Sequence, residues 1–264
     1  MNLGLKGKVA LVLAASKGLG RASAATLAAE GASVIIGARN RQTLETTAKD
    51  IELETGSRVL AVPTDVTREK ELEIIVAATV QEFGYIDILV NNAGGPPSGT
   101  FDTVGDEQWQ SAFELNLLSA VRLVRLALPH MRQRGSGRII NIVSTSVKEP
   151  IEGLLLSNAL RMAVVGLAKT LSLELAPDNI TVNNVCPGRF LTDRLRHGHM
   201  IKEKIARGMS EAEALRSVAQ DIPMGRIGKP EELAALVAFL ASEQAGYITG
   251  TTIQVDGGLV RAMF

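Results

Sequence analysis

The order of patterns in the first forty residues is the strongest constraint on the fold. Residues 8–14 are almost continuously apolar, which is typical of a strand buried on both faces of a parallel sheet. A glycine turn at 15–20, a helical pattern at 21–30 and a second apolar run at 33–38 follow. Strand, turn, helix and strand form a βαβ unit whose turn directs backbone N–H groups at one point. We therefore predict a pyrophosphate site at this turn, because the flanking elements supply the context that a lone glycine motif lacks.

The same alternation continues along the chain. Helices are expected at 42–55, 69–83, 107–131, 157–175 and 230–242, and strands at 58–62, 86–90, 138–143, 180–186 and 252–255. Repeated βα alternation predicts an α/β fold: a doubly wound, parallel, seven-stranded sheet with helices on both faces, Rossmann-like, in one domain over residues 1–264. Ligands of such sheets bind at the carboxyl ends of the strands. The polar segment 189–222 breaks the rhythm, and we expect it to form a mobile helical flap over the site.

Composition excludes several classes of partner. The formal net charge is zero and aromatic residues make up only 3%, so nucleic acid and anionic membranes are poor candidates. The single cysteine, Cys186, excludes an internal disulfide and fits a reducing compartment. The first residues lack the apolar core of a secretory signal, and no apolar stretch approaches ~18 residues. We expect a soluble cytoplasmic protein.

A set of ordered motifs runs from Gly7 to about Leu259. These motifs are the glycine turn, Asp65-Val66, Asn-Asn-Ala-Gly at 91–94, Asn116, Ser144, Pro187-Gly188 and Val-Asp-Gly-Gly at 255–258. With them the chain resembles the short-chain dehydrogenase/reductase family, and it is most similar to members like the 3-oxoacyl-carrier-protein reductases. The resemblance implies an NAD(P)-binding doubly wound fold and a small-molecule substrate. It also implies a homotetramer with dimer contacts through the two long helices.

The resemblance further implies which residues hold the cofactor. The glycine turn would contribute Ala14, Ser16, Lys17, Gly18, Leu19 and Gly20; Asp65 and Val66 would contact the adenine; Asn91, Ala93 and Gly94 would line the dinucleotide; and Pro187, Gly188 and Thr192 would lie near the nicotinamide. The family usually has Thr-Gly where this chain has Leu13-Ala14. Alanine there costs some backbone freedom, and we still expect binding.

Charge at the end of the second predicted strand favours NADP(H) over NAD(H). A unit specific for NAD(H) places an acidic residue about twenty positions past the glycines, where it accepts hydrogen bonds from the ribose 2′-OH. This chain has no carboxylate at that position but has Arg39, whose planar guanidinium can pair with a 2′-phosphate. Lys17 adds a second positive charge. The alternative is that both are solvated surface charges.

The expected catalytic pattern is only partly present. Ser144 matches the family's serine after the fifth strand, but Ser157 and Arg161 stand where the family has the tyrosine and lysine of Tyr-x-x-x-Lys. Helical i, i+4 spacing keeps these two on one face. Arginine is not a conservative replacement for lysine, and an aliphatic hydroxyl is a far poorer general acid than a phenol. Losing general acid catalysis typically costs roughly 10²–10⁴ in rate.

Three functions are compatible with this departure. In the first, which we favour, the protein is an NADP(H)-dependent oxidoreductase acting on a carbonyl or hydroxyl group. Ser144 then polarises the carbonyl, and Ser157, a water held by Asn116 or a flap residue delivers the proton. In the second, the protein binds NADP(H) without chemistry, as a sensor or partner subunit. In the third, Arg161 clamps the carboxylate of an anionic substrate and different chemistry occurs. We expect no metal site.

Overall fold

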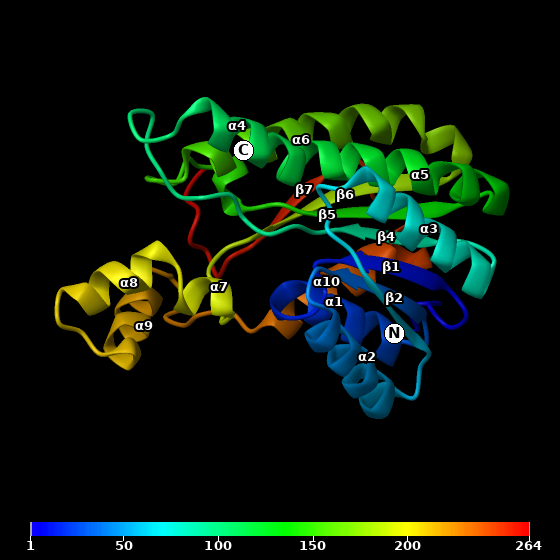
Figure 1. The fold of residues 1–264 in the computed structure, drawn as a ribbon, viewed down its shortest axis with the longest axis horizontal. Coiled ribbons are helices and arrows are strands. Elements are labelled where there is room, and N and C mark those ends of the chain that lie inside the picture. The colour runs from blue at the N-terminus through cyan, green and yellow to red at the C-terminus, as the bar shows by residue number, and fades with distance from the viewer. Residues whose placement is uncertain (1, 264) are drawn as a thin grey trace.

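The computed structural model describes residues 2–263 and contains one parallel sheet of seven strands in the order β3-β2-β1-β4-β5-β6-β7 (Figure 1). The strands are β1 (Val9–Leu13), β2 (Ser33–Ala38), β3 (Val59–Pro63), β4 (Ile88–Asn91), β5 (Gly137–Ile142), β6 (Ile180–Pro187) and β7 (Thr252–Val255). All six adjacent pairs are parallel. The predicted doubly wound, Rossmann-like fold is therefore confirmed.

Helices cover both faces of this sheet (Figure 1). The α-helices are α1 (Gly18–Ala29), α2 (Arg41–Thr55), α3 (Glu69–Phe83), α4 (Asp106–Phe113), α5 (Ser119–Arg134), α6 (Leu155–Glu174), α7 (Asp193–Arg196), α8 (His199–Ala206), α9 (Glu211–Gln220) and α10 (Pro230–Ala241). One face packs against α1, α2 and α10, and the other against α3, α5 and α6. No helix within residues 2–263 has the length and apolarity needed to span a bilayer.

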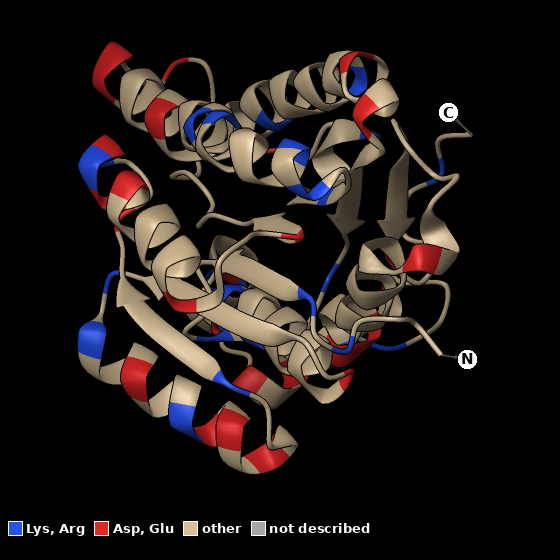
Figure 2. Cartoon of the chain, turned by 90° about the vertical axis from the view of Figure 1, so that its right-hand side faces the viewer, with Lys and Arg blue, Asp and Glu red and all other residues tan. Residues whose placement is uncertain are grey.

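The apolar runs form central strands because both of their faces are buried. Along β1, Ala10 and Val12 pack toward α1 and α10, while Leu11 and Leu13 pack toward α3 and α5. A strand covered on both sides must be apolar at every position rather than at alternate ones. Figure 2 shows the complementary pattern, with charged residues gathered on the helices and the strands almost entirely uncharged.

Two predicted helices differ from the observed ones by more than two residues at an end. α1 begins at Gly18 rather than at residue 21, because the N–H of Arg21 donates to the carbonyl oxygen of Lys17 at 3.3 Å and so brings the glycines of the turn into the first helical turn. The predicted helix at 107–131 is instead α4 and α5 joined by a π-helical segment, Glu114–Leu118. Such widened turns insert a residue and are frequent at functional sites.

The polar segment 189–222 is helical, as predicted, and forms α7, α8 and α9. It has a small apolar cluster of its own, in which Ile201, Ala214 and Val218 are buried. In Figure 1, α8 and α9 project from the body of the molecule beyond α7. The mobility of this flap stays a prediction.

Ala14, the first residue after β1, adopts a left-handed backbone with φ of +49°. Only glycine reaches this region without a steric penalty, so the family's glycine at this position has a physical reason. The cost that the sequence predicted for alanine at this position is therefore backbone strain at Ala14.

We expect Ala14→Gly to stabilise the protein by about 1 kcal/mol, because glycine relieves this strain at a smaller entropic cost. The thermal midpoint would rise by about 3 °C. Ala15→Gly is the matched control: Ala15 is buried with an ordinary φ, so the same change there should destabilise by about 1 kcal/mol. Thermal unfolding of both variants measures this, and no gain for Ala14→Gly would contradict a left-handed Ala14.

Candidate functional site

The candidate cleft lies where the winding of the sheet reverses. β1 lies between β2 and β4, while the chain runs from β1 to β2 and returns to β4 only after β3. The connections that follow β1 and β4 therefore run to opposite faces of the sheet, which opens a crevice at the carboxyl ends of these two strands. The glycine turn after β1 and the Asn-Asn-Ala-Gly sequence after β4 both meet there.

Close packing at the glycine turn holds α1 against β1. A Cβ on Gly20 would collide with the carbonyl oxygen of Ala14 and would lie 2.8 Å from Nδ2 of Asn92. Asn92 Nδ2 in turn donates a hydrogen bond of 3.4 Å to that carbonyl oxygen. Gly18 has a φ of +59°, which also favours glycine. The turn is further tied to α2 by Thr47, whose hydroxyl donates to the carbonyl oxygen of Ser16 at 2.9 Å.

The N-terminus of α1 is open to an anion. Its N-cap residue, Lys17, makes no side-chain capping bond to the first turn, and no acidic residue lies in that turn. The first N–H groups of a helix need partners and carry partial positive charge, so a phosphate group fits here. Leu19 is half-buried beside these groups.

The residues predicted to recognise the adenosine end lie after β2 and β3. Arg39 is exposed, and within residues 2–263 it has no ion-pair partner. Burial raises the pKa of Asp65, but hydrogen bonds from Thr67 and the charges of Arg39 and Arg68 outweigh it, so the pKa lies below its usual value. Val66 is buried. Arg39 is therefore free to receive a second anion near the ionised Asp65.

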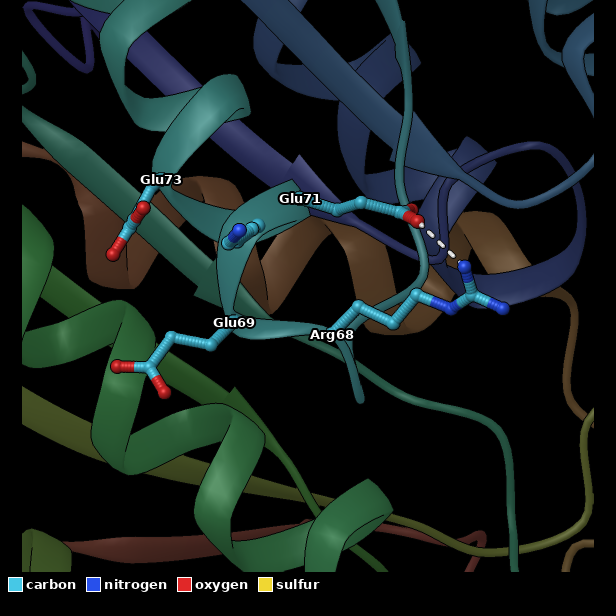
Figure 3. A pocket seen from close by; sticks show the side chains of 5 residues that line it. Arg68, Glu69, Glu71 and Glu73 are labelled. Carbon is cyan, nitrogen blue, oxygen red and sulfur yellow. Dashed lines mark ion pairs between the residues drawn. The ribbon is translucent and has the colours of Figure 1, made fainter.

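A surface groove of about 580 Å³ at the start of α3 does not suit a nucleotide (Figure 3). It is lined by Arg68, Glu69, Lys70, Glu71 and Glu73. Three of these charges are already paired: Arg68 lies 3.5 Å from Glu71, and Glu69 lies 3.5 Å from Arg122 of α5. An acidic groove of this kind would repel phosphates.

Ser144 lies directly after β5, where its hydroxyl accepts a hydrogen bond of 3.1 Å from the N–H of Ser146. Ser157, in the first turn of α6, is only 7% exposed, and its hydroxyl lies 3.4 Å from that of Ser146. The structure thus links the two predicted catalytic serines through Ser146 rather than directly. Sequence analysis did not single out Ser146 as a site residue, although it lies only two residues after Ser144.

Arg161 places a positive charge beneath the site. It lies one turn after Ser157 on α6, and Nη1 donates to the carbonyl oxygen of Ile142 at 3.1 Å. Burial lowers the pKa of Arg161 to about 10; the nearby charge of Arg194 lowers it too, whereas Cys186 opposes the change. Burial also raises the pKa of Cys186 to about 12. Arg161 is thus charged and Cys186 neutral at physiological pH.

A cavity of about 20 Å³ lies between Asn116, Asn91 and Arg161. Asn116 belongs to the π-helical segment, and its Nδ2 donates to the carbonyl oxygen of Gly94 at 3.0 Å. The buried Oδ1 atoms of Asn116 and Asn91 have no hydrogen-bond donor within residues 2–263. A cavity of this size with two acceptors and a nearby cation suits one water molecule.

A ladder of buried amides extends from this cavity across the sheet. Asn91 donates to Asn141 and Asn141 to Asn184, each at 2.9 Å, and Asn184 donates to Thr252 at 3.0 Å. The four residues occupy neighbouring register positions on β4, β5, β6 and β7. Sequence reasoning missed Asn141 and Asn184, although asparagine within an apolar run was a detectable signal.

The flap closes one side of the cleft through α7. Thr192 packs on Gly18, where an added Cβ would lie 3.4 Å from Cγ2 of the threonine. Lys17 Nζ lies 3.0 Å from Oδ2 of Asp193, and this hydrogen bond and charge lower the pKa of the carboxyl. Arg194 donates to the carbonyl oxygens of Gly95 and Pro96, each at 3.3 Å. Sequence reasoning missed Asp193 and Arg194.

The remaining predicted positions also line this edge of the sheet. Pro187 ends β6, and Gly188 follows it so close to Asp256 that an added Cβ would lie 2.6 Å from Asp256 Cβ. Ala93 and Gly94 follow β4 directly. The structure therefore brings all the predicted residues to the carboxyl ends of the strands, and their individual roles stay predictions.

Neither tyrosine lies in the cleft. Tyr85 precedes β4, and its hydroxyl donates to the carbonyl oxygen of Gly7 at 3.0 Å; Tyr247 precedes β7 and is fully exposed. Both are at the opposite, amino-terminal edge of the sheet. Among the flap histidines, His199 lies 3.6 Å from Glu203 within α8 and is exposed. No group of three or more potential metal ligands is found in residues 2–263.

Comparison with known proteins gives consistent matches over the whole chain. The family model described as "Enoyl-(Acyl carrier protein) reductase" matches residues 13–260. The chain is 35% identical to dehydrogenase/reductase SDR family member 4 of Caenorhabditis elegans, over 96% of this chain and 95% of that protein. It is 37% identical to the 3-oxoacyl-[acyl-carrier-protein] reductase FabG of Vibrio cholerae, over 97% and 99%. The solved structure of L-sorbose reductase from Gluconobacter frateurii, complexed with NADPH and L-sorbose, is 37% identical with a TM-score of 0.95, and each chain is covered completely.

The burial of Arg161 predicts a pH dependence for Arg161→Lys. Burial disfavours the charged form, so a lysine here is deprotonated at lower pH when folded than when unfolded. The unfolded chain then binds more protons, and stability rises with pH between the folded pKa and about 10.4. In the wild type, the same rise of stability with pH begins only at about pH 10, the pKa of Arg161 in the folded protein. Between pH 7 and 9.5 the variant should therefore gain about 1 kcal/mol relative to the wild type.

Urea unfolding at several pH values measures this difference. Arg125→Lys is the matched control, because Arg125 lies exposed on α5 and should show no such gain. If the difference in unfolding free energy between Arg161→Lys and the wild type does not change with pH, the guanidinium is solvated.

Proposed function

The chain belongs to the short-chain dehydrogenase/reductase family, and from that premise we propose that it is an NADP(H)-dependent oxidoreductase acting on a carbonyl or hydroxyl group. The resemblance found in the sequence is thereby confirmed. The single observation that carries the proposal is the uncapped N-terminus of α1, which faces the crevice beside β4 with no acidic residue in its first turn. Backbone N–H groups there fit a diphosphate.

The charges around the turn support NADP(H) rather than NAD(H). Arg39 follows β2 without an ion-pair partner in residues 2–263, and no carboxylate takes the place of the residue that would bind a ribose 2′-OH. A guanidinium fork suits a 2′-phosphate. The similar L-sorbose reductase structure contains NADPH, which is consistent with this assignment. When bound, NADPH would supply the hydride.

Residues at the end of β5 and on α6 would manage the substrate oxygen. Ser144 is half-buried after β5 and would donate a hydrogen bond to the oxygen of the substrate carbonyl, which would polarise that carbonyl for reduction to an alcohol. The charge of Arg161 would stabilise the developing oxyanion from below. Ser157 is buried against Ser146, so we favour a water held by Asn116 as the proton carrier.

The second candidate is an NADP(H)-binding protein without catalytic activity. It is favoured by one observation: both tyrosines lie at the edge of the sheet away from the cleft, so no phenol is available there as a general acid. NADPH binding without turnover on a broad panel of carbonyls and alcohols would support this candidate over the first. Assembly as a homotetramer and a cytoplasmic location stay predictions.

Arg39→Met tests the cofactor assignment. Removal of a charged hydrogen-bonding partner typically costs about 1.5–3 kcal/mol, so the affinity for NADPH should fall about 10- to 100-fold while that for NADH stays nearly constant. Arg41→Met is the control, since Arg41 lies two residues away, exposed and 3.4 Å from Glu45. Fluorescence titration with both nucleotides measures this, and binding of neither by the wild type would refute the proposed function.

Restoring the family pair tests whether the proton donor limits the rate. Ser157→Tyr with Arg161→Lys should raise NADPH-dependent reduction of simple ketones by about 10²–10⁴, because a phenol is a competent general acid at a site where Ser144 is already placed. The matched control is Ser157→Phe with Arg161→Lys, which adds the ring without the hydroxyl. If the tyrosine variant folds, binds NADPH and stays inert, the pocket has diverged beyond these two positions.

A further inference from the structure

Three cations at the carboxyl ends of β4, β5 and β6 have no carboxylate partner. Within residues 2–263, Arg161, Arg194 and Lys148 form no ion pair, whereas Lys17 and Arg196 on the same side do. They lie at the same edge of the sheet: Arg161 donates to the Ile142 carbonyl at the end of β5, Arg194 donates to the Gly95 and Pro96 carbonyls beyond β4, and Lys148 ends the short helix that follows β5. Partly buried charge without a counter-charge is costly, so an anion from outside would be stabilised there.

The carboxylate that reaches the same region does not neutralise these cations. The charge of Asp256 acts on Cys186, but its two oxygens accept hydrogen bonds from the backbone N–H groups of Gly258 and Val260, each at 2.9 Å. Held in this way, Asp256 forms no ion pair with any of the three cations.

The cofactor's own charges would be bound in the other half of the cleft. Its diphosphate fits the N-terminus of α1, and its 2′-phosphate fits Arg39 after β2. The second half of a doubly wound sheet, around β4 to β6, receives the nicotinamide end, which carries no negative charge. The three cations thus remain available to the substrate.

We propose that the substrate is a carbonyl compound bearing a carboxylate, and that Arg194 of α7 binds this carboxylate while Arg161 and Lys148 raise the local positive potential. This inference rests on the proposed function, because it assigns the substrate class of the same site. The sequence suggested Arg161 as the residue that binds a substrate carboxylate, whereas this proposal assigns that contact to Arg194 of the flap.

Arg194 is better placed than Arg161 for direct contact. Arg161 is half-buried, and its guanidinium is bonded to the Ile142 carbonyl. Arg194 is exposed, and its two Nη atoms donate only to the Gly95 and Pro96 carbonyls, each at the long distance of 3.3 Å. The guanidinium lies directly over Gly95, where an added Cβ would make Arg194 shift. A carboxylate could replace these two weak contacts with a bidentate pair.

Matched acids and esters test the proposal. With saturating NADPH, kcat/KM is measured for benzoylformate, acetoacetate and levulinate and for their methyl esters. At least one acid should exceed its ester by tenfold or more. Arg194→Met should remove at least tenfold of that preference, through KM rather than kcat, and should leave the Kd for NADPH within twofold. Arg196→Met is the control on the same helix, since Arg196 is paired with Glu211 at 2.6 Å, and it should leave the preference unchanged.

Calorimetric titration with benzoylformate, with and without NADPH, keeps the two proposals separate. If no carbonyl is reduced, the proposed function fails, but tighter binding of benzoylformate than of its ester, lost in Arg194→Met, still supports the anion site. Equal binding and turnover of acids and esters would overturn it. So would an acid preference that survives in Arg194→Met, or a selective loss of NADPH affinity in that variant, which would assign Arg194 to the cofactor.

Discussion

The close approach of the first helix to the first strand is the contact on which the cleft depends. Gly20 packs where a Cβ would collide with the carbonyl oxygen of Ala14, and Asn92 from the neighbouring strand donates to the same oxygen. A side chain at this position would push α1 away from β1 and move its N–H groups off their common point. Because this contact lies at the reversal between β1 and β4, it sets both the packing of the sheet and the shape of the binding crevice.

Buried polar groups organise the other half of the cleft. The amide ladder of Asn91, Asn141 and Asn184 fixes the ends of three strands relative to one another and ends in the cavity beside Arg161. Polar groups in such surroundings stabilise a structure only when all of them find partners. Asn91 and Asn116 both line that cavity and both have an acceptor oxygen without a donor, so a single water near Arg161 would complete the network. We infer that the same water position can serve structure and proton supply.

α7 is held over this cleft by weak contacts. Lys17 and Asp193 are both largely exposed, and exposed ion pairs of this kind contribute at most about 1 kcal/mol. The two Arg194 contacts are long. α8 and α9 pack on one another around their own small apolar cluster, whereas Phe190 at the start of the flap is buried in the main core and is bridged to Gly228. Ligands that attract Lys17 or Arg194 would therefore act on the part of the flap beyond Phe190.

The sequence by itself determined the elements and the sheet, and it predicted where an anion would bind, because apolar runs and the glycine turn depend on local backbone chemistry. Ser33–Ala38 and Glu69–Phe83 were predicted to the residue. Contacts between distant segments could be decided only by the tertiary structure. The widened turn at Asn116, the amide ladder and the placement of Arg194 over Gly95 depend on strand register and on the packing of the flap. A linear pattern carries neither of these, since both arise from side chains that meet only after the sheet has formed.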